Sequence, residues 1–189
     1  MLLATTAQAD HAMPDYSMPV YRATLAQIGT SGVTGDVIIF VEKGQSMFGA
    51  GAASGLEANL NDKTNCTAKN GCGVHVHKGK GCASAQEQGG HYFKGSTDPW
   101  AAIRYQKSSA AGNANFDFIV NDAGTDIEGR AFVVHNNAGG RVACGVLKKH
   151  TTKIGNSGHE HAASGTARSM EFSATITIFF VFVYTLFAM

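Results

Sequence analysis

Two histidines spaced two residues apart are the first feature of this sequence that could do chemistry. His75 and His77 lie in the apolar run CGVHVHKGKGCAS, residues 72–84, and a cysteine stands on either side of them. In a β-strand, side chains at positions i and i+2 point to the same face. The two imidazoles would then lie side by side, each with a nitrogen available to a metal ion. The spacing alone is a weak signal, so the rest of the chain has to decide.

Two further histidines lie in strand-like segments. His91 follows a glycine pair in GGHYFKG, and His135 ends the apolar run RAFVVH. For any one of these histidines taken alone, the alternative is a core or surface histidine with an ordinary hydrogen-bond partner. The motif HEH at His159–His161 could be a second metal-binding box. We expect no functional role for it, because it lies in a Gly/Ser/Thr-rich segment beyond the strand-like region.

The elements that must position these histidines are strands. The chain has 189 residues, which suggests one domain with a real core. From residue 21 to 149, short β-branched and apolar runs alternate with Gly, Asn and Asp turns, and no sustained helical period is present. Eight such runs predict an all-β fold, an eight-stranded antiparallel sandwich or Greek-key barrel. The runs are residues 21–28, 32–43, 46–56, 73–79, 100–108, 114–122, 127–136 and 139–149.

Flanking segments point to the cell surface. Residues 1–20 contain an A-x-A pattern at Ala7–Ala9, typical of a partial signal peptide whose true start is left open. Residues 150–171 are predicted to be a flexible Ser/Gly/Thr stalk. Residues 172–189 are uncharged and apolar, which favours a glycosylphosphatidylinositol signal removed in the mature protein. The alternatives are a retained tail anchor and a soluble core helix. The formal net charge of +1 gives no indication of a nucleic-acid partner.

The cysteine content agrees with a location at the cell surface. An even set of four in a secreted chain favours two disulfides, for which the sequence allows three connectivities. The polar insert at residues 57–72 is predicted to be a surface loop pinned by a local Cys66–Cys72 bridge. It contains the sequon NCT, which makes Asn65 a candidate glycosylation site.

Longer motifs carry a family resemblance. The run GRAFVVHNNAGGRVACGVL, residues 129–147, closely resembles the C-terminal signature of the copper/zinc superoxide dismutase family, GR-x-x-V-V-H followed by N-A-G-x-R-x-A-C-G-V. GVHVHKGKGCAS resembles the family's G-F-H-V-H strand and its downstream loop cysteine, and GGHYFKG resembles its G-P-H-F-N-P loop. These elements follow the family's order across residues 21–149. The resemblance implies the family's β-fold and disproportionation of superoxide into hydrogen peroxide and oxygen at copper.

The resemblance also assigns roles to single residues. Arg141 matches the arginine that holds the superoxide anion, for which the alternative is a strand-end surface charge. Cys82 and Cys144 match the family's disulfide. The copper ligands it implies are His75, His77, His91 and His135, of which His91 occupies the bridging position and can also return a proton. Four imidazoles suit Cu(II), and a guanidinium suits a small oxyanion.

Two departures from the two-metal enzymes predict copper without zinc. Those enzymes place further histidines and an aspartate after the bridging histidine, whereas here only Asp98 is available, and one histidine with one carboxylate cannot close a zinc site. Their long charged loop is replaced here by the five residues 136–140, which should leave the copper channel open. Both features match the copper-only, extracellular branch of the family. Without zinc, the second nitrogen of His91 needs another partner, for which Asp98 and Glu87 are the acidic candidates.

The sequence therefore predicts a cell-surface, copper-only superoxide dismutase. Its expected partners are the superoxide anion and a membrane reached through the C-terminal anchor, and we expect a monomer. The alternatives are a non-catalytic domain that stores or delivers copper, and a structural or adhesive surface protein.

Overall fold

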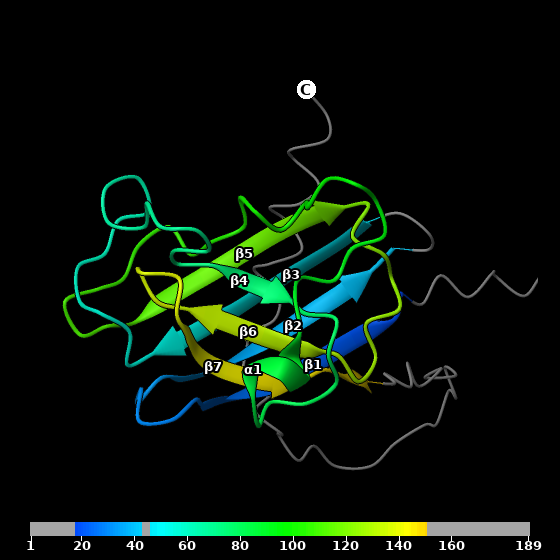
Figure 1. The fold of residues 1–189 in the computed structure, drawn as a ribbon, viewed down its shortest axis with the longest axis horizontal. Coiled ribbons are helices and arrows are strands. Elements are labelled where there is room, and N and C mark those ends of the chain that lie inside the picture. Colours follow the sequence, from blue (N-terminus) through cyan, green and yellow to red (C-terminus); the bar gives the residue numbers. More distant parts are fainter. Residues whose placement is uncertain (1–17, 43–45, 151–189) are drawn as a thin grey trace, which may run out of the picture. The chain divides into compact units, whose positions relative to one another are not determined.

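The computed structural model describes residues 18–42 and 46–150, and this part of the chain is nearly all β (Figure 1). Every strand pairing in it is antiparallel, so the predicted all-β antiparallel fold is confirmed. A helix of one turn, α1 (Ala85–Gln88), lies in a long connection. The strands are β1 (Val20–Gln27), β2 (Thr34–Val41), β3 (Ser46–Ser54), β4 (Val74–Val76), β5 (Ala114–Asn121), β6 (Ala131–His135), β7 (Arg141–Val146) and β8 (Lys148–His150).

Several sequence predictions concern residues outside these ranges. The signal-peptide pattern, the His159–His161 motif and the apolar C-terminal tail lie within residues 1–17 and 151–189, which are not among the described residues. Across residues 18–42 and 46–150, no helix combines the length and apolar character needed to cross a membrane.

The strands form one curled sheet in the order β4-β6-β7-β1-β2-β3-β5, with β8 beside β1. In Figure 1, the part made of β4, β6 and β7 lies in front of the part made of β1, β2, β3 and β5. Three connections, from β3 to β4, from β4 to β5 and from β5 to β6, cross from one end of this strand order to the other. Such long crossings between antiparallel strands make a Greek-key arrangement. We call the two parts the front layer and the back layer.

The core lies between these layers because the strands of both layers direct buried apolar side chains toward each other. In β5 the buried side chains Ala114, Phe116, Phe118 and Val120 alternate with exposed ones. Phe132 of β6 stacks on Phe116 and on Phe118 across the core, with 6.0 Å between ring centroids in each pair. Apolar burial of this kind is the main force holding the two layers together.

One predicted strand is wrong. Residues 100–108 make only isolated bridges, although their composition is strand-like. The physical reason is that the segment buries its aromatics from a loop beside β4. The Trp100 indole donates to Tyr92 O at 2.7 Å, and the Tyr105 hydroxyl donates to His135 O at 3.1 Å. Both rings are fully buried.

The run predicted as one final strand is divided into β7 and β8. Leu147 lies between them, is fully buried and belongs to neither strand. Its N–H donates to Arg130 O at 2.9 Å, and its carbonyl accepts from Gly129 N at 2.8 Å. The described residues therefore form eight strands, but not the eight that the sequence predicted.

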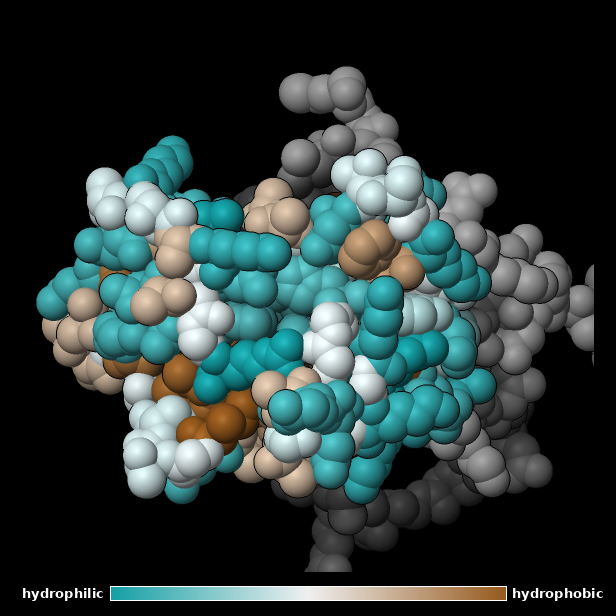
Figure 2. Space-filling view, in the orientation of Figure 1, coloured by the Kyte–Doolittle hydropathy of each residue, from teal (hydrophilic) through white to brown (hydrophobic). Residues whose placement is uncertain are grey.

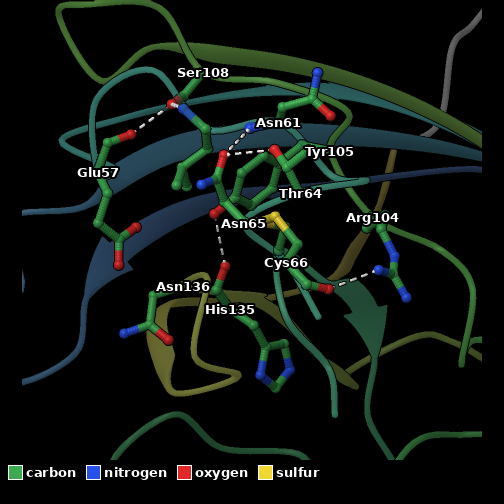
Figure 3. Close-up of a disulfide and its surroundings, with 12 residues drawn as sticks. Glu57, Asn61, Thr64, Asn65, Cys66, Arg104, Tyr105, Ser108, His135 and Asn136 are labelled. Atoms are coloured by element: carbon green, nitrogen blue, oxygen red, sulfur yellow. Dashed lines mark hydrogen bonds between the residues drawn. A yellow bond between two sulfur atoms is a disulfide. The ribbon is translucent and has the colours of Figure 1, made fainter. Parts of the chain in front are cut away.

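Two disulfides hold the long connections. Cys66 is joined to Cys72 in the polar insert, and Cys82 to Cys144, which are the pairs proposed from the sequence. Figure 3 shows the first of these, where Arg104 donates to Cys66 O at 2.9 Å. Asn65 beside it is exposed, and its glycosylation stays a prediction.

A second, smaller apolar cluster lies on the outer side of the front layer. It consists of Ala131, Val133 and Cys144, with Ile28 and Cys82 packed against it. The connection that carries α1 covers this side, and the surface it presents is largely hydrophilic (Figure 2). The side chains on this side of the front layer therefore lie outside the main core.

Candidate metal centre

Four imidazoles meet on the outer side of the front layer. Their ring centroids lie 4.2–6.4 Å apart pairwise, and one ring nitrogen of each lies within 4.8 Å of the others. Three of the side chains are at most 1% exposed, and the side chain of His91 is 9% exposed. The members are His75, His77, His91 and His135, which form the one group of metal-ligand type found in the described part of the chain.

Strand alternation in β4 brings the first two together. Val74 and Val76 point into the main core, so His75 points to the opposite side. His77 follows two residues later, and its backbone forms an isolated antiparallel β-bridge with that of His91. A Cβ on Gly73 would lie 2.2 Å from the His75 ring, so only glycine leaves room for that imidazole.

Backbone carbonyls fix the tautomers of three rings. Each of the following nitrogens lies 2.9 Å from a carbonyl oxygen: His75 Nε2 from Ile103 O, His77 Nδ1 from Gly89 O, and His135 Nδ1 from Gly139 O. A carbonyl oxygen can only accept, so the nitrogen that faces it carries the hydrogen. The other nitrogen of each neutral ring therefore presents a lone pair.

These lone pairs face one another. His77 Nε2 and His135 Nε2 lie 3.5 Å apart, and since both are acceptors, this contact is not a hydrogen bond. The buried atoms His75 Nδ1 and His91 Nε2 have no hydrogen-bond partner among residues 18–42 and 46–150. Buried polar atoms left unpaired are costly and rare. One metal ion between the rings would satisfy all four nitrogens, so the residues present fit a metal site.

Electrostatics keep the rings in the ligand form. Burial, acting first, lowers the pKa of His75 to about 2, that of His77 to about 3 and that of His135 to about 4. The neighbouring histidines lower them further, and Arg141 adds to the effect on His77 and His135. All three rings are neutral at pH 7, which is the form that binds a metal ion.

Asp98 lies against the fourth ring. Its Oδ2 is 2.7 Å from His91 Nδ1, and its Oδ1 accepts from Trp100 N at 3.0 Å. The carboxylate is thus fixed by the backbone while it orients the imidazole. Glu87, the other acidic candidate, instead accepts from Ala83 N at 3.2 Å.

A β-bulge places Arg141 beside the cluster. The register between β6 and β7 shifts after Val134, so that His135 lies opposite Arg141. The guanidinium donates from Nη1 to Ala85 O and to Gln88 Oε1, both at 2.9 Å, and from Nη2 to Gly89 O at 2.7 Å. Of its five N–H groups, the one on Nε and one on Nη2 find no acceptor among the described residues.

The same carbonyl serves a ligand and the arginine. Gly89 O lies 2.9 Å from His77 Nδ1 and 2.7 Å from Arg141 Nη2. The cationic group is therefore tied to the rim of the metal centre by two hydrogen bonds through one oxygen. A displacement of this loop would move both His77 and Arg141.

Gln88 is a site residue that the sequence analysis missed. Its side chain is 1% exposed, accepts from Arg141 through Oε1 and donates from Nε2 to Cys82 O at 3.2 Å. Because Cys82 is bonded to Cys144 of β7, the loop, the disulfide and the strand of Arg141 form one connected unit. No sequence motif marks this glutamine, since only the folded loop brings it to the guanidinium.

The short link between His135 and Arg141 also supports the site. Gly139 has a φ of +82°, and a Cβ there would lie 2.0 Å from Lys69 O, so the position requires glycine. The turn is closed by Asn136 N donating to Gly140 O at 2.8 Å. This conformation directs Gly139 O to the ring of His135.

Comparison with known proteins gives distant likenesses only. No protein-family model and no curated protein matches this chain. A solved structure of the clock protein EA4 is 20% identical with a TM-score of 0.48, over 72% of this chain and 99% of that one. Superoxide dismutase 5 of Candida albicans with Cu(II) is 17% identical with a TM-score of 0.45, over 76% of this chain and 100% of that one. A mutant of the same enzyme reaches a TM-score of 0.49 at 15% identity, over 76% of this chain and 99% of that one. Neither a family nor an activity of this chain follows from values this low.

Proposed function

We propose that this protein is a superoxide dismutase of the copper/zinc type that uses copper alone and acts at the cell surface. One observation carries the proposal: one ring nitrogen of each of four imidazoles lies within 4.8 Å of the others, next to a guanidinium with two N–H groups that find no acceptor among the described residues. The first feature suits a redox-active metal, and the second suits a small oxyanion.

The residues that would hold copper are His75, His77, His91 and His135. A copper ion held there would supply a one-electron couple, Cu(II)/Cu(I), for the disproportionation of two superoxide anions and two protons into oxygen and hydrogen peroxide. An all-nitrogen set of this kind is typical of copper rather than of calcium or magnesium, which prefer oxygen ligands.

Arg141 has the role of attracting and orienting the anion. The positive charge of Arg141 acts on the metal centre, because it lowers the pKa of His77 and of His135. Three of its N–H groups are anchored to the α1 connection, so the direction of the remaining two is fixed. A donor pair held in a fixed direction would stabilise a bound anion without reorganisation.

The proposal of copper without zinc rests on the second nitrogen of His91. A bridging histidine would use that nitrogen for a second metal, whereas here Asp98 Oδ2 lies 2.7 Å from it. His91 Nδ1–H donating to a carboxylate is the usual arrangement of a ligand to a single ion. The same contact keeps a proton within the site for transfer.

The proposed location follows from chemistry and from the flanking sequence. Two disulfides in a chain of this size are typical of oxidising compartments, including the cell exterior. The apolar residues 172–189 supply the proposed anchor, as a lipid-attachment signal or a retained tail.

Stopped-flow decay of superoxide with copper-loaded protein tests the proposed activity. The rate should exceed that of free copper, and Arg141→Ala should lose most of it while keeping its copper. Arg141→Lys is the matched control, since it restores the charge without the fork of donors and should recover part of the rate. Copper-loaded protein without decay above the free-metal control would instead favour the storage or delivery domain.

A further inference from the structure

One row of side chains on the outer face of the back layer is unusually apolar. A sheet face exposed to water normally carries polar side chains at every second position. Most inward positions of β1, β2, β3 and β5 are buried as expected. Among the outward ones, Phe48 is 37% exposed and Ile119 is 67% exposed. We call this surface the outer sheet face; its apolar members are Ile38, Phe40, Phe48, Ala50, Ala52 and Ile119, and Val20, which is only 9% exposed, lies at its edge.

Strand register arranges these side chains in rows. Val20 lies opposite Phe40, which lies opposite Phe48, which lies opposite Ile119, so one apolar row crosses all four strands. The rings of Phe40 and Phe48 stack with 5.0 Å between centroids. Such a continuous row is typical of a contact surface rather than of a solvated one.

The next row carries charge at its two ends. Arg22 lies opposite Ile38, Ile38 opposite Ala50, and Ala50 opposite Asp117. On the other side of β1, Lys148 lies opposite Arg22. Like charges directly opposite are destabilising, and no carboxylate of the described residues lies within ion-pair distance of either cation. Asp117 is three strands from Arg22, about 14 Å away at the usual strand spacing, so the two cannot pair within one chain.

This pattern is self-complementary. Consider two outer sheet faces packed with a two-fold axis between β2 and β3, parallel to the strands. The axis brings β1 over the partner's β5 and β2 over the partner's β3. Because the axis is parallel to the strands, each row of side chains faces the same row of the partner. Arg22 then meets the partner's Asp117, and Phe40 meets the partner's Phe48. Both contacts occur twice, as an isologous interface requires.

We propose that the outer sheet face binds a second copy of this chain, forming a two-fold symmetric dimer. Aligned packing of two sheets tolerates this geometry, because the twist turns them by only about 30°. The site histidines lie on the outer side of the front layer, so the dimer leaves the metal centre open. The inference departs from the monomer expected from the sequence.

The size of the face sets the expected strength. Four strands about 4.8 Å apart, over about seven residues, cover on the order of 400 Å² in each subunit. A stable interface of standard size buries about 800 Å² in each partner. We therefore expect a reversible dimer with a dissociation constant of micromolar order.

Sedimentation velocity of the full chain in a non-ionic detergent, from low to high micromolar concentration, tests the proposal. Arg22→Asp and Asp117→Arg should each be monomeric, with dissociation constants raised about a hundredfold or more, because each turns two attractions into two repulsions. Mixed in equal amounts, they should form a heterodimer, in which both pairs are again of opposite sign. Lys63→Asp, an equal charge reversal on an exposed loop, should dimerise like the unaltered chain.

The same variants distinguish association through the outer sheet face from association through other parts of the chain. Every variant keeps residues 151–189, so association through that segment would be the same in all of them. Ile119→Lys, at the most exposed apolar position, gives a second variant that should be monomeric without touching the charged row. A chain that stays monomeric at every concentration, single variants that dimerise normally, or a mixture that does not recover the dimer would each overturn the proposal.

Discussion

Removing the metal should make the stability of the protein strongly dependent on pH. His75, His77 and His135 have folded-state pKa values of about 2, 3 and 4, below the ordinary value of 6.5, because they are buried. Below pH 6.5 the unfolded chain binds protons that the folded chain excludes. Stability is therefore complete above about pH 6.5 and is lost as the pH falls toward the folded values.

The magnitude follows from the difference in proton binding. At about pH 5, each of the three rings withholds nearly one proton over about 1.5 pH units, which costs about 2 kcal/mol per ring. The three together reduce the free energy of unfolding by up to about 6 kcal/mol. A domain of this size has a total of about 5–15 kcal/mol, so metal-free protein should be close to unfolding in mild acid.

Urea unfolding of metal-free protein between about pH 8 and pH 5 measures this effect. The midpoint should be constant in the upper part of the range and fall steeply below about pH 6.5. His135→Gln should reduce the fall by about one third, because one of three titrating rings is gone. His150→Gln, at the exposed end of β8, is the matched control for replacing a histidine outside the metal centre. A midpoint that does not change between about pH 7 and pH 5 would refute the burial of three neutral imidazoles.

Three further predictions concern the groups around the centre. Asp98→Asn should weaken copper binding about 10- to 100-fold in a competition titration, because His91 loses its orienting carboxylate; unchanged affinity and activity would exclude that role. Gln88→Ala should lower the rate of superoxide decay at constant copper content, because one anchor of the guanidinium is lost, and an unaltered rate would show that the backbone carbonyls suffice. Replacing both Cys82 and Cys144 by serine opens a bridge between residues 62 apart and should cost about 4 kcal/mol of unfolding free energy; an unchanged urea midpoint would contradict it.

Sequence pattern was sufficient where burial follows a simple period. The alternation in ANFDFIVN predicts β5 and its inward face, because a strand between core and solvent has no other arrangement. It was misleading at residues 100–108, where Trp100 and Tyr105 are buried in the core from a loop and donate hydrogen bonds to the carbonyls of Tyr92 and His135. Aromatic content indicates burial but does not distinguish a strand from a loop that packs on one.

The site was predictable to the extent that side-chain type determines the chemistry. Histidines and an arginine can be recognised by type and spacing, and Asp98 could be proposed because it is the nearest carboxylate after His91. The groups that fix the tautomers could not be predicted, because they are the backbone oxygens of Ile103, Gly89 and Gly139. Every residue carries such an oxygen, and only the fold selects which ones face the rings.

Copper and zinc counted per chain by elemental analysis, after the full-length protein has been loaded with both metals and dialysed, is the most direct test of the metal centre. Four inward lone pairs and a fourth ring already held by Asp98 predict one copper and no bound zinc. Stoichiometric zinc beside the copper, or copper that stays bound after His75 and His135 are both replaced, would contradict the account.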